Sequence, residues 1–357
     1  MGSTIAVVPE VDEYAERLWA AVADGDETAA VGSVLDGYRA GIDPEALLLD
    51  VIGAVQRRVG IEWAGNRLTV AQEHAATSIN DRAIAALAHV HRFPEPTRGR
   101  ITVSCVDGEW HALPARLLAE VLRLRGFRID YLGAQVPGPH LIAHLHRTGP
   151  DAVALSGSIA TRLPTAHATI TACQAAGIPV MAGGAAFGPD GRYARQFGAQ
   201  AWAPDARAAA DRLAEPLPRP HEAHQPIDDL PHLADQEYTM ISRSNRQLVQ
   251  AMYTGLEDRI PAMRDYTDLQ HQHTAEDLAH IVDFLATAVY TGDSSLFTSF
   301  ILWTAEILEA RAVPATALPP SLELLGAELR DFPRATAMLR EAGAALASLV
   351  AGREVRA

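Results

Sequence analysis

Residues 101–114 read ITVSCVDGEWHALP, a short apolar run followed by a polar loop and then by a new apolar stretch. Short runs rich in β-branched residues are typical of buried strands, and apolar residues three and four positions apart are typical of helices. The two patterns alternate, which predicts strands at 101–106, 127–132, 152–156 and 178–182 and helices at 112–125, 139–147, 163–175 and 192–197. This alternation predicts a Rossmann-like parallel sheet with helices on both faces, where ligands bind beyond the carboxyl ends of the strands.

Helical regions are predicted on both sides of this Rossmann-like domain, whose bounds we set at residues 98–214. Residues 10–93 show helical spacing with turn residues at the joints, which predicts a four-helix cap packed as an antiparallel bundle. Five prolines within residues 215–236 indicate a linker, and residues 237–353 are again helical, with Thr274 expected to cap the start of a helix. The predicted fold class is therefore α/β plus all-α, in three domains.

The composition excludes several classes of protein. The formal net charge of the 357 residues is −14, so the chain lacks the excess of basic side chains with which a general nucleic-acid binder neutralises phosphates. We see no signal peptide at the N-terminus, and no apolar run approaches the ~20 residues of a membrane span. Cys105 and Cys173 lie in apolar surroundings without metal-type spacing, which indicates buried free thiols in a cytoplasmic protein.

The loop after the first predicted strand carries the residues that indicate chemistry. His111 follows that strand, so its imidazole is expected to point at a ligand lying over the strand ends. Imidazole is a good donor to a metal such as cobalt, and Glu109 could hold the other ring nitrogen. A single loop histidine is more often structural than functional, so the loop alone leaves both interpretations open.

Four segments together resemble the cobalamin-binding Rossmann domains. That family has an Asp/Glu-x-His-x-x-Gly motif in the loop after its first strand, and Glu109-Trp110-His111 matches the first part of the motif. The family continues with Leu-Gly-x-x-Val-Pro, Ser-x-Ser/Thr and Gly-Gly after the next three strands. This chain has the corresponding residues at 132–137, 156–158 and 183–184.

The resemblance implies a role for each matched residue. His111 would be the lower axial ligand of the cobalt, and Glu109 and Trp110 would belong to the cofactor site. Pro114 stands where the motif has glycine, but proline is tolerated in the first turn of a helix. The channel for the nucleotide tail of the cofactor would be lined by Ser156, Ser158, Gly183 and Gly184.

A second motif lies in the cap. Trp63 is followed, after nine residues, by Glu73-His74, which is similar to the Trp-x9-Glu-His motif of the CarH-type cobalamin-dependent photoreceptors. The resemblance implies adenosylcobalamin, with Trp63 and Glu73 against its adenosyl group, His74 supporting the contact of the cap with the sheet domain, and light-driven cleavage of the cobalt–carbon bond. Two features depart from that family: no DNA-binding module precedes the cap, and Glu62 and Ala64 flank Trp63 where the family has a histidine. From spacing alone, core packing explains Trp63 equally well.

The C-terminal region resembles globin- and phycobiliprotein-like helical modules, which hold a tetrapyrrole, over His273–Leu278 and its apolar continuation to Arg311. The three-part order resembles that of photocobilins, in which a CarH-like unit is fused to a bilin-binding domain. Because no cysteine follows Cys173, a bilin such as biliverdin would be held noncovalently. A dimerisation module without a cofactor is the alternative. The candidate bilin-binding residues are Tyr253, Arg259, Arg264, Tyr266, His271, His273, His280 and Trp303.

The sequence as a whole predicts a cytoplasmic light sensor rather than an enzyme. It would bind adenosylcobalamin and a bilin, contact neither nucleic acid nor membrane directly, and signal through a homo-oligomer or a partner protein. Two alternatives stay open at this point. One is a corrinoid protein that carries methyl groups for methyltransferases, whose motif usually has Asp before the histidine, and the other is a cobalamin sensor without photochemistry.

Overall fold

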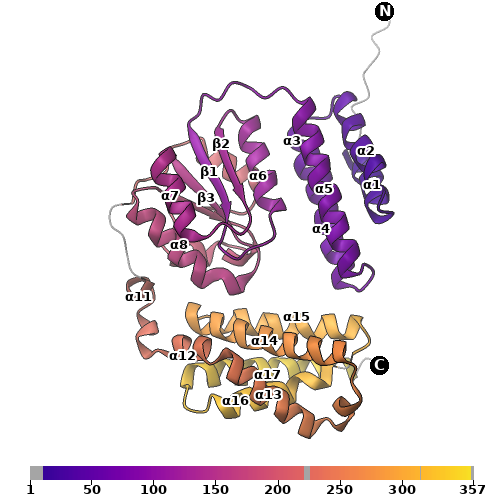
Figure 1. Cartoon of the computed structure of the whole chain (residues 1–357), viewed down its shortest axis with the longest axis vertical. Coiled ribbons are helices and arrows are strands. Elements are labelled where there is room, and N and C mark those ends of the chain that lie inside the picture. The colour runs from indigo at the N-terminus through magenta and orange to yellow at the C-terminus, as the bar shows by residue number, and fades with distance from the viewer. Residues whose placement is uncertain (1–10, 221–225, 314, 355–357) are drawn as a thin grey trace, which may run out of the picture. The chain divides into compact units, whose positions relative to one another are not determined.

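The structure is a computed structural model that describes residues 11–220, 226–313 and 315–354 (Figure 1). It divides into two compact units, Met1–His224 and Gln225–Ala357, each with its own apolar core. Residue 10, where the predicted cap begins, and residues 221–225 of the predicted linker lie outside the described residues. In the part of the chain that the structure describes, no helix has both the length and the apolar content to cross a membrane.

A parallel sheet of five strands forms the centre of the first unit and confirms the predicted Rossmann-like fold. The strands are β1 (Arg100–Cys105), β2 (Arg128–Gly133), β3 (Ala152–Ser156), β4 (Val180–Gly183) and β5 (Ala201–Ala203). The helices between and after them are α6 (Leu113–Leu124), α7 (Gly138–Thr148), α8 (Leu163–Ala175), α9 (Arg192–Gln196) and α10 (Ala206–Leu213). The prediction lacks β5 because three residues are too few for a periodic pattern.

The strand order β2-β1-β3-β4-β5 determines where this sheet can hold a ligand. After β1 the chain turns to one side to form β2, whereas β3, β4 and β5 extend the sheet on the other side of β1. The loops that follow β1 and β3 therefore leave the sheet in opposite directions, and sheets of this kind bind ligands between two such loops, at the carboxyl ends of the strands. The loop with His111 and the segment Ser156-Gly157-Ser158 follow these two strands.

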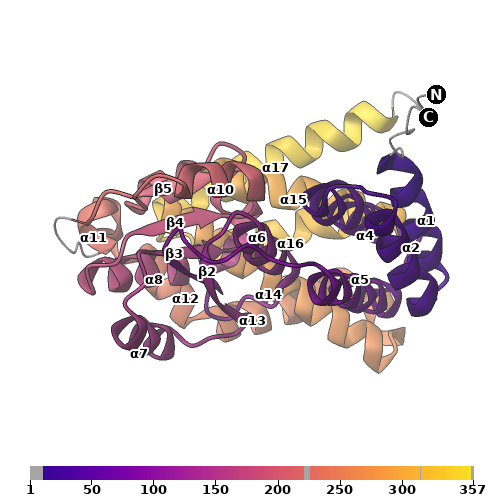
Figure 2. The same ribbon diagram turned by 90° about the horizontal axis from the view of Figure 1, so that it is seen from above.

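The cap contains the four predicted helices. They are α1 (Val11–Ala23), α2 (Glu27–Arg39), a third helix that runs through α3 (Pro44–Ala46), η1 (Leu47–Ile52) and α4 (Gly53–Ala64), and α5 (Val70–Val90). Their apolar faces bury residues such as Leu18, Val34, Val51 and Ile84. The apolar core continues from the cap into the sheet domain, and Figures 1 and 2 both show the cap helices beside the sheet on the side of α6. The cap and the sheet domain thus pack as one unit.

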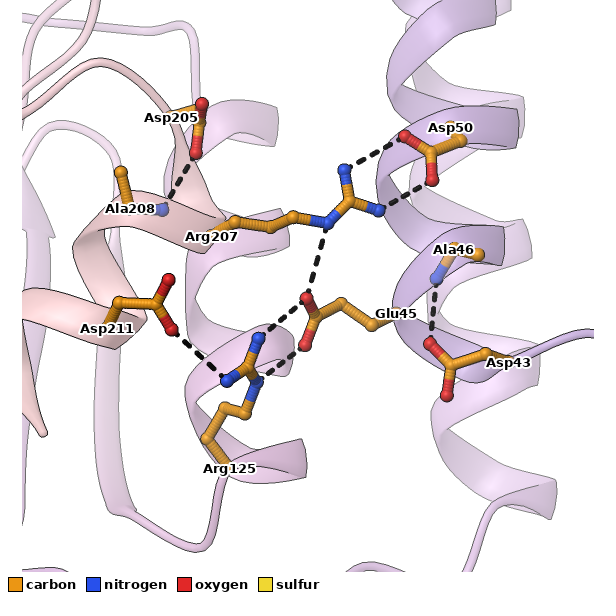
Figure 3. Close-up of polar contacts among 9 residues, drawn as sticks. All are labelled: Asp43, Glu45, Ala46, Asp50, Arg125, Asp205, Arg207, Ala208 and Asp211. Atoms are coloured by element: carbon orange, nitrogen blue, oxygen red, sulfur yellow. Dashed lines mark hydrogen bonds and ion pairs between the residues drawn. The ribbon is translucent and has the colours of Figure 1, made fainter.

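Ion pairs join the cap to the sheet domain at α3 and η1 (Figure 3). Arg125, directly after α6, donates to the two carboxylate oxygens of Glu45 at 2.7 and 2.9 Å. Arg207 in α10 donates to the two oxygens of Asp50 at 3.0 and 2.5 Å, and its Nε lies 3.3 Å from Glu45. The Glu45 side chain is 13% exposed, and the hydrogen bond from Arg125 lowers the pKa of this carboxyl. Such two-pronged pairs fix orientation in addition to contributing attraction.

Replacing Arg125 with Gln is expected to loosen the cap, because the largely buried Glu45 carboxylate then loses its main partner. We expect the cap amides to lose about 1–2 kcal/mol of protection in native-state hydrogen exchange, between the values typical of exposed and of buried pairs. Arg39→Gln is the matched control, since Arg39 pairs with Asp36 at 2.9 Å but is 69% exposed, and it should cost less than about 0.5 kcal/mol. Equal protection in the two variants would show that the Arg125 pair does not hold the cap.

The second unit is all-α in its described residues, as predicted. Its first helices are α11 (Pro226–Asp229) and η4 (Pro231–Asp235), both within the predicted linker. They are followed by α12 (Glu237–Arg243), α13 (Asn245–Arg259), η5 (Pro261–Asp265), α14 (Asp268–Thr291), α15 (Ser294–Ala310), η6 (Ala315–Ala317), α16 (Leu318–Glu328) and α17 (Pro333–Glu354). A separate apolar core lies among these helices.

The predicted helix start at Thr274 is wrong. The helix begins at Asp268, where Thr267 and Gln270 form a reciprocal capping box. Thr274 lies inside α14, and its hydroxyl donates to the carbonyl of Gln270 one turn earlier at 2.9 Å. The residues between the two threonines include neither glycine nor proline, so the helix extends back to the earlier cap.

Candidate cofactor-binding site

The carboxylate of Glu109 ties together the loops after β1 and β3. One oxygen accepts hydrogen bonds from Nδ1 of His111 at 2.6 Å and from the backbone N–H of His111 at 3.0 Å. The other oxygen accepts from the backbone N–H groups of Ser158 at 2.7 Å and Ile159 at 3.0 Å. These bonds join the loop after β1 to the loop after β3 and fix the position of the imidazole relative to the β3 loop.

Glu109 is fully buried, with 0% of its surface exposed, and yet it is charged. Burial alone would raise the pKa of this carboxyl, but the hydrogen bonds from the His111 side chain and from the three backbone N–H groups outweigh burial and lower the pKa to about 2. The carboxylate is therefore ionised at neutral pH and acts only as an acceptor.

The imidazole of His111 presents one defined nitrogen away from Glu109. Since the Glu109 carboxylate only accepts, Nδ1 of His111 must donate, and the lone pair of a neutral ring is then on Nε2. The His111 side chain is 44% exposed, and Nε2 accepts a hydrogen bond from the indole Nε1 of Trp110 at 3.0 Å. An imidazole held through Nδ1 with its lone pair on Nε2 is the arrangement found in metal-ligating histidines.

The loop after β2 is attached to the same site. The backbone N–H of Gln135 donates to the carbonyl of Glu109 at 3.2 Å, from a left-handed backbone conformation with φ of 57°. Asp107 accepts a hydrogen bond from the backbone N–H of Gly138, at the start of α7, at 3.2 Å. Below the loop, Cys105 ends β1. Burial raises the pKa of the thiols of Cys105 and Cys173 to about 12, and both are buried free cysteines as predicted.

The two glycines after β4 have different surroundings. Gly184 has φ of +98°, and a Cβ on it would lie 2.3 Å from the carbonyl oxygen of Gly157, so only glycine lets these two loops approach. A Cβ on Gly183 would meet the carbonyl oxygen of Ala203 at 3.4 Å, which is ordinary contact. Gly184 is therefore required by the fold, whereas Gly183 leaves space beside the strand end. Ser156 is buried and Ser158 is half-buried in the neighbouring loop.

The three candidate residues of the cap lie on the two sides of the turn between α4 and α5. Trp63 lies in the last turn of α4 and is half-buried, and Glu73 and His74 lie in the first turns of α5. Nδ1 of His74 lies 2.8 Å from the Glu73 carboxylate, and His74 is 75% exposed. Figure 1 shows the start of α5 toward the end of the first unit at which the strands have their carboxyl ends.

A chain of hydrogen bonds leads from Glu73 into the cap, and the sequence analysis does not include it. Thr77 donates to Glu73 at 3.0 Å, Gln56 donates to Thr77 at 2.8 Å, and the fully buried Asn80 donates to Gln56 at 2.8 Å. Residues 73, 77 and 80 are polar and lie four and three positions apart, so they share one face of α5. This spacing is the sequence signal from which the polar chain could have been predicted.

The candidate bilin residues lie on several elements of the second unit. The hydroxyl of Tyr253 is hydrogen-bonded to Nδ1 of His271, and the Tyr266 ring lies 5.8 Å from the His271 ring, so these three side chains form one cluster. Arg259 is paired with Glu323 at 2.7 Å. Three other candidates, Arg264, His273 and His280, are exposed, and Trp303 is 44% exposed with its ring 6.4 Å from that of Phe300.

Comparison with known proteins identifies the class of domain. Residues 99–213 match the family model described as B12 binding domain, and residues 14–88 match a second model with the same description. The first unit thus consists of a Rossmann-like cobalamin-binding domain with its helical cap. The matches support cobalamin as the cofactor.

The individual relatives are of two kinds. The HTH-type transcriptional repressors CarA and CarH of Myxococcus xanthus are each 31% identical over 183 residues, about half of this chain and about 60% of their own length. The trimethylamine corrinoid protein of Methanosarcina barkeri is 22% identical over 209 residues, 57% of this chain and 95% of that protein. The solved structure of the monomethylamine corrinoid protein of the same organism matches 57% of this chain and 99% of its own, with a TM-score of 0.51 and 18% identity, which supports the fold.

Proposed function

We propose that the first unit binds adenosylcobalamin with Nε2 of His111 as the lower ligand of cobalt, and that the protein senses light. The observation that carries the proposal is the Glu109 clamp, which holds Nδ1 of His111 and turns Nε2 away from Glu109. The residues present fit the cofactor, because the site offers one fixed imidazole and a small residue, Gly183, at the neighbouring strand end. When bound, adenosylcobalamin supplies a cobalt–carbon bond that light can break.

The cap would cover the upper side of this site. Trp63 offers a flat apolar surface, and Glu73 is oriented by the hydrogen bond from Thr77. The resemblance to CarA and CarH, at 31% identity over 183 residues, favours adenosylcobalamin and a sensory role. The cap would not depend on its contacts at Trp63 and Glu73 alone. The shared apolar core and the ion pairs at Glu45 and Asp50 would keep it attached if those contacts were lost.

A comparison of two glycine variants tests where the nucleotide tail lies. Gly183→Ala is expected to leave thermal stability unchanged, since the added methyl group meets a carbonyl oxygen at 3.4 Å, but to weaken cobalamin binding about 10-fold or more by filling the channel. Gly184→Ala is expected to lower stability even without cofactor, because its Cβ would collide with Gly157. Equilibrium dialysis measures the affinity for cobalamin. An unchanged affinity in Gly183→Ala would show that the nucleotide tail does not lie at Gly183.

Illumination of the loaded protein tests the sensory role. Protein loaded with adenosylcobalamin in the dark is expected to change its visible absorption under green light and, in the same sample, to change the hydrogen exchange of α4 and α5 or its size on gel filtration. A sample kept in the dark is the control. Photolysis that leaves both cap exchange and size unaltered would contradict the sensor.

The second candidate function is a corrinoid carrier of methyl groups, and one observation favours it. The match with the trimethylamine corrinoid protein covers 95% of that protein and 57% of this chain. A carrier would exchange a methyl group with a methyltransferase, and it would do so without a structural response to light. The illumination experiment therefore separates the two candidates.

We also propose a bilin, such as biliverdin, in the second unit, at the cluster of Tyr253, Tyr266 and His271. Aromatic and imidazole side chains suit the faces of a tetrapyrrole, and two candidates for its propionates, Arg259 and Arg264, lie on or next to α13. Addition of biliverdin should give a far-red absorption band that is lost in His271→Leu and kept in His146→Leu, a change of an exposed histidine in α7. Without such a band, a dimerisation module is the better assignment.

The cellular setting follows from the same proposal. We infer a cytoplasmic protein that acts through self-association or a partner protein rather than by contacting nucleic acid. The net charge of −14 supports this choice, since it opposes the approach of a polyanion.

A further inference from the structure

We propose that Trp110 is a gate on the cobalamin site: its indole occupies Nε2 of His111 in the cofactor-free protein and has to move aside before cobalt binds. The proposal rests on the proposed function for the identity of the ligand. The contact that carries it is the hydrogen bond from Nε1 of Trp110 to Nε2 of His111, at 3.0 Å.

The donors and acceptors at this contact allow one arrangement. Nδ1 of His111 faces the Glu109 carboxylate at 2.6 Å, and Nε2 faces the indole N–H of Trp110 at 3.0 Å. An indole N–H only donates, and it therefore uses the same lone pair that a metal ion would use. The lone pair serves either Trp110 or cobalt, and the two compete directly.

Burial shows which of the two side chains can move. His111 is held through its side chain and its backbone by the fully buried Glu109. Trp110 is 64% exposed, which is unusual for so large an apolar side chain, and its ring meets that of His111 nearly edge-on, at 5.7 Å and 68°. Rotation of the Trp110 side chain breaks the bond to Nε2 and leaves the clamp of Glu109 intact.

The gate also favours a metal that arrives inside a macrocycle. A displaced indole can bond to water through its N–H, and its large flat face can pack on an apolar surface. The ring system of a corrinoid offers such a surface next to the ligated imidazole, and a hydrated metal ion offers none.

The first test uses the cofactor-free protein labelled with ¹⁵N. Nuclear magnetic resonance is expected to show a scalar coupling across the hydrogen bond between Nε1 of Trp110 and Nε2 of His111, and a changed ¹⁵N shift of His111 Nε2 in Trp110→Phe. This variant keeps an aromatic ring and removes the donor. An identical His111 shift in the two proteins would overturn the proposal.

The second test measures binding rates of adenosylcobalamin by surface plasmon resonance in the dark. Trp110→Phe is expected to associate about fivefold faster than the wild type, the factor that corresponds to one net hydrogen bond. Trp19→Phe is the control, since Trp19 lies in the cap under Arg58 and should leave both rates unchanged. Equal association rates in wild type and Trp110→Phe would overturn the gate but not the proposed function. If neither of these two proteins binds adenosylcobalamin, the proposed function is overturned as well.

Discussion

Replacing His111 with Ala is expected to lower the affinity for cobalamin by at least about 100-fold, because the change removes the nitrogen that we assign to cobalt. Loss of a residue that only orients a metal ligand typically costs 10- to 100-fold, so loss of the ligand itself should cost more. The fold should persist, since His111 is 44% exposed and Glu109 keeps its bonds from Ser158 and Ile159. Equilibrium dialysis in the dark measures the affinity.

Two controls accompany this variant. His146→Ala removes an exposed histidine in α7 of the same domain and should bind cobalamin like the wild type. Free imidazole should partly restore binding to His111→Ala, because it can enter the space that the side chain leaves. If His111→Ala binds cobalamin with the affinity of the wild type, His111 is not the ligand of cobalt.

Replacing Glu109 with Gln is expected to destabilise the first unit by about 3 kcal/mol at pH 7. An ordinary pKa of 4.5 and a value of about 2 in the folded protein correspond to a charge stabilised by roughly that amount. The amide also places a donor where the carboxylate accepted, so either the His111 bond or the bonds from the β3 loop must break. Urea unfolding, followed by pulse-labelling hydrogen exchange of the β1 and β3 peptides, isolates this unit from the other one.

The same variant has a predictable dependence on pH. The pKa of Glu109 is lower in the folded than in the unfolded protein, so its contribution to stability is complete above pH 4.5 and declines as the pH falls toward 2. The difference between wild type and Glu109→Gln should therefore stay constant from pH 8 to 6 and shrink below pH 4.5. Glu95→Gln, at an exposed position, should match the wild type throughout. If the difference in stability between wild type and Glu109→Gln stays the same below pH 4.5, the charge of Glu109 contributes nothing to stability.

The sequence predicts the sheet well because its strands depend on local patterns. The strands β1 to β4 are apolar runs of four to six residues, and parallel strands bring the loops that follow them to one edge. The bond between Glu109 and His111 is also local, since two positions separate the residues.

The parts that the sequence does not predict depend on tertiary contacts. Glu109 also binds the backbone of Ser158, 49 positions later, and Arg125 pairs with Glu45 across 80 positions, and no periodic pattern marks either pair. Trp110 is implied as a cofactor residue by its place in the motif, but its bond to Nε2 of His111 depends on side-chain geometry that only a structure supplies. The predicted helix start at Thr274 is wrong because Thr267 offers an equivalent N-cap signal about two turns earlier.

The central claim is that Nε2 of His111 is the lower ligand of cobalt, and electron paramagnetic resonance of the protein loaded with cob(II)alamin tests it most directly. The unpaired electron couples to the axial nitrogen, so a ¹⁴N ligand splits the cobalt lines into triplets and a ¹⁵N ligand splits them into doublets. In protein labelled with ¹⁵N-histidine and loaded with unlabelled cofactor, we predict doublets. Triplets would show that the nitrogen of the cofactor's own dimethylbenzimidazole stays on cobalt, and would contradict the account.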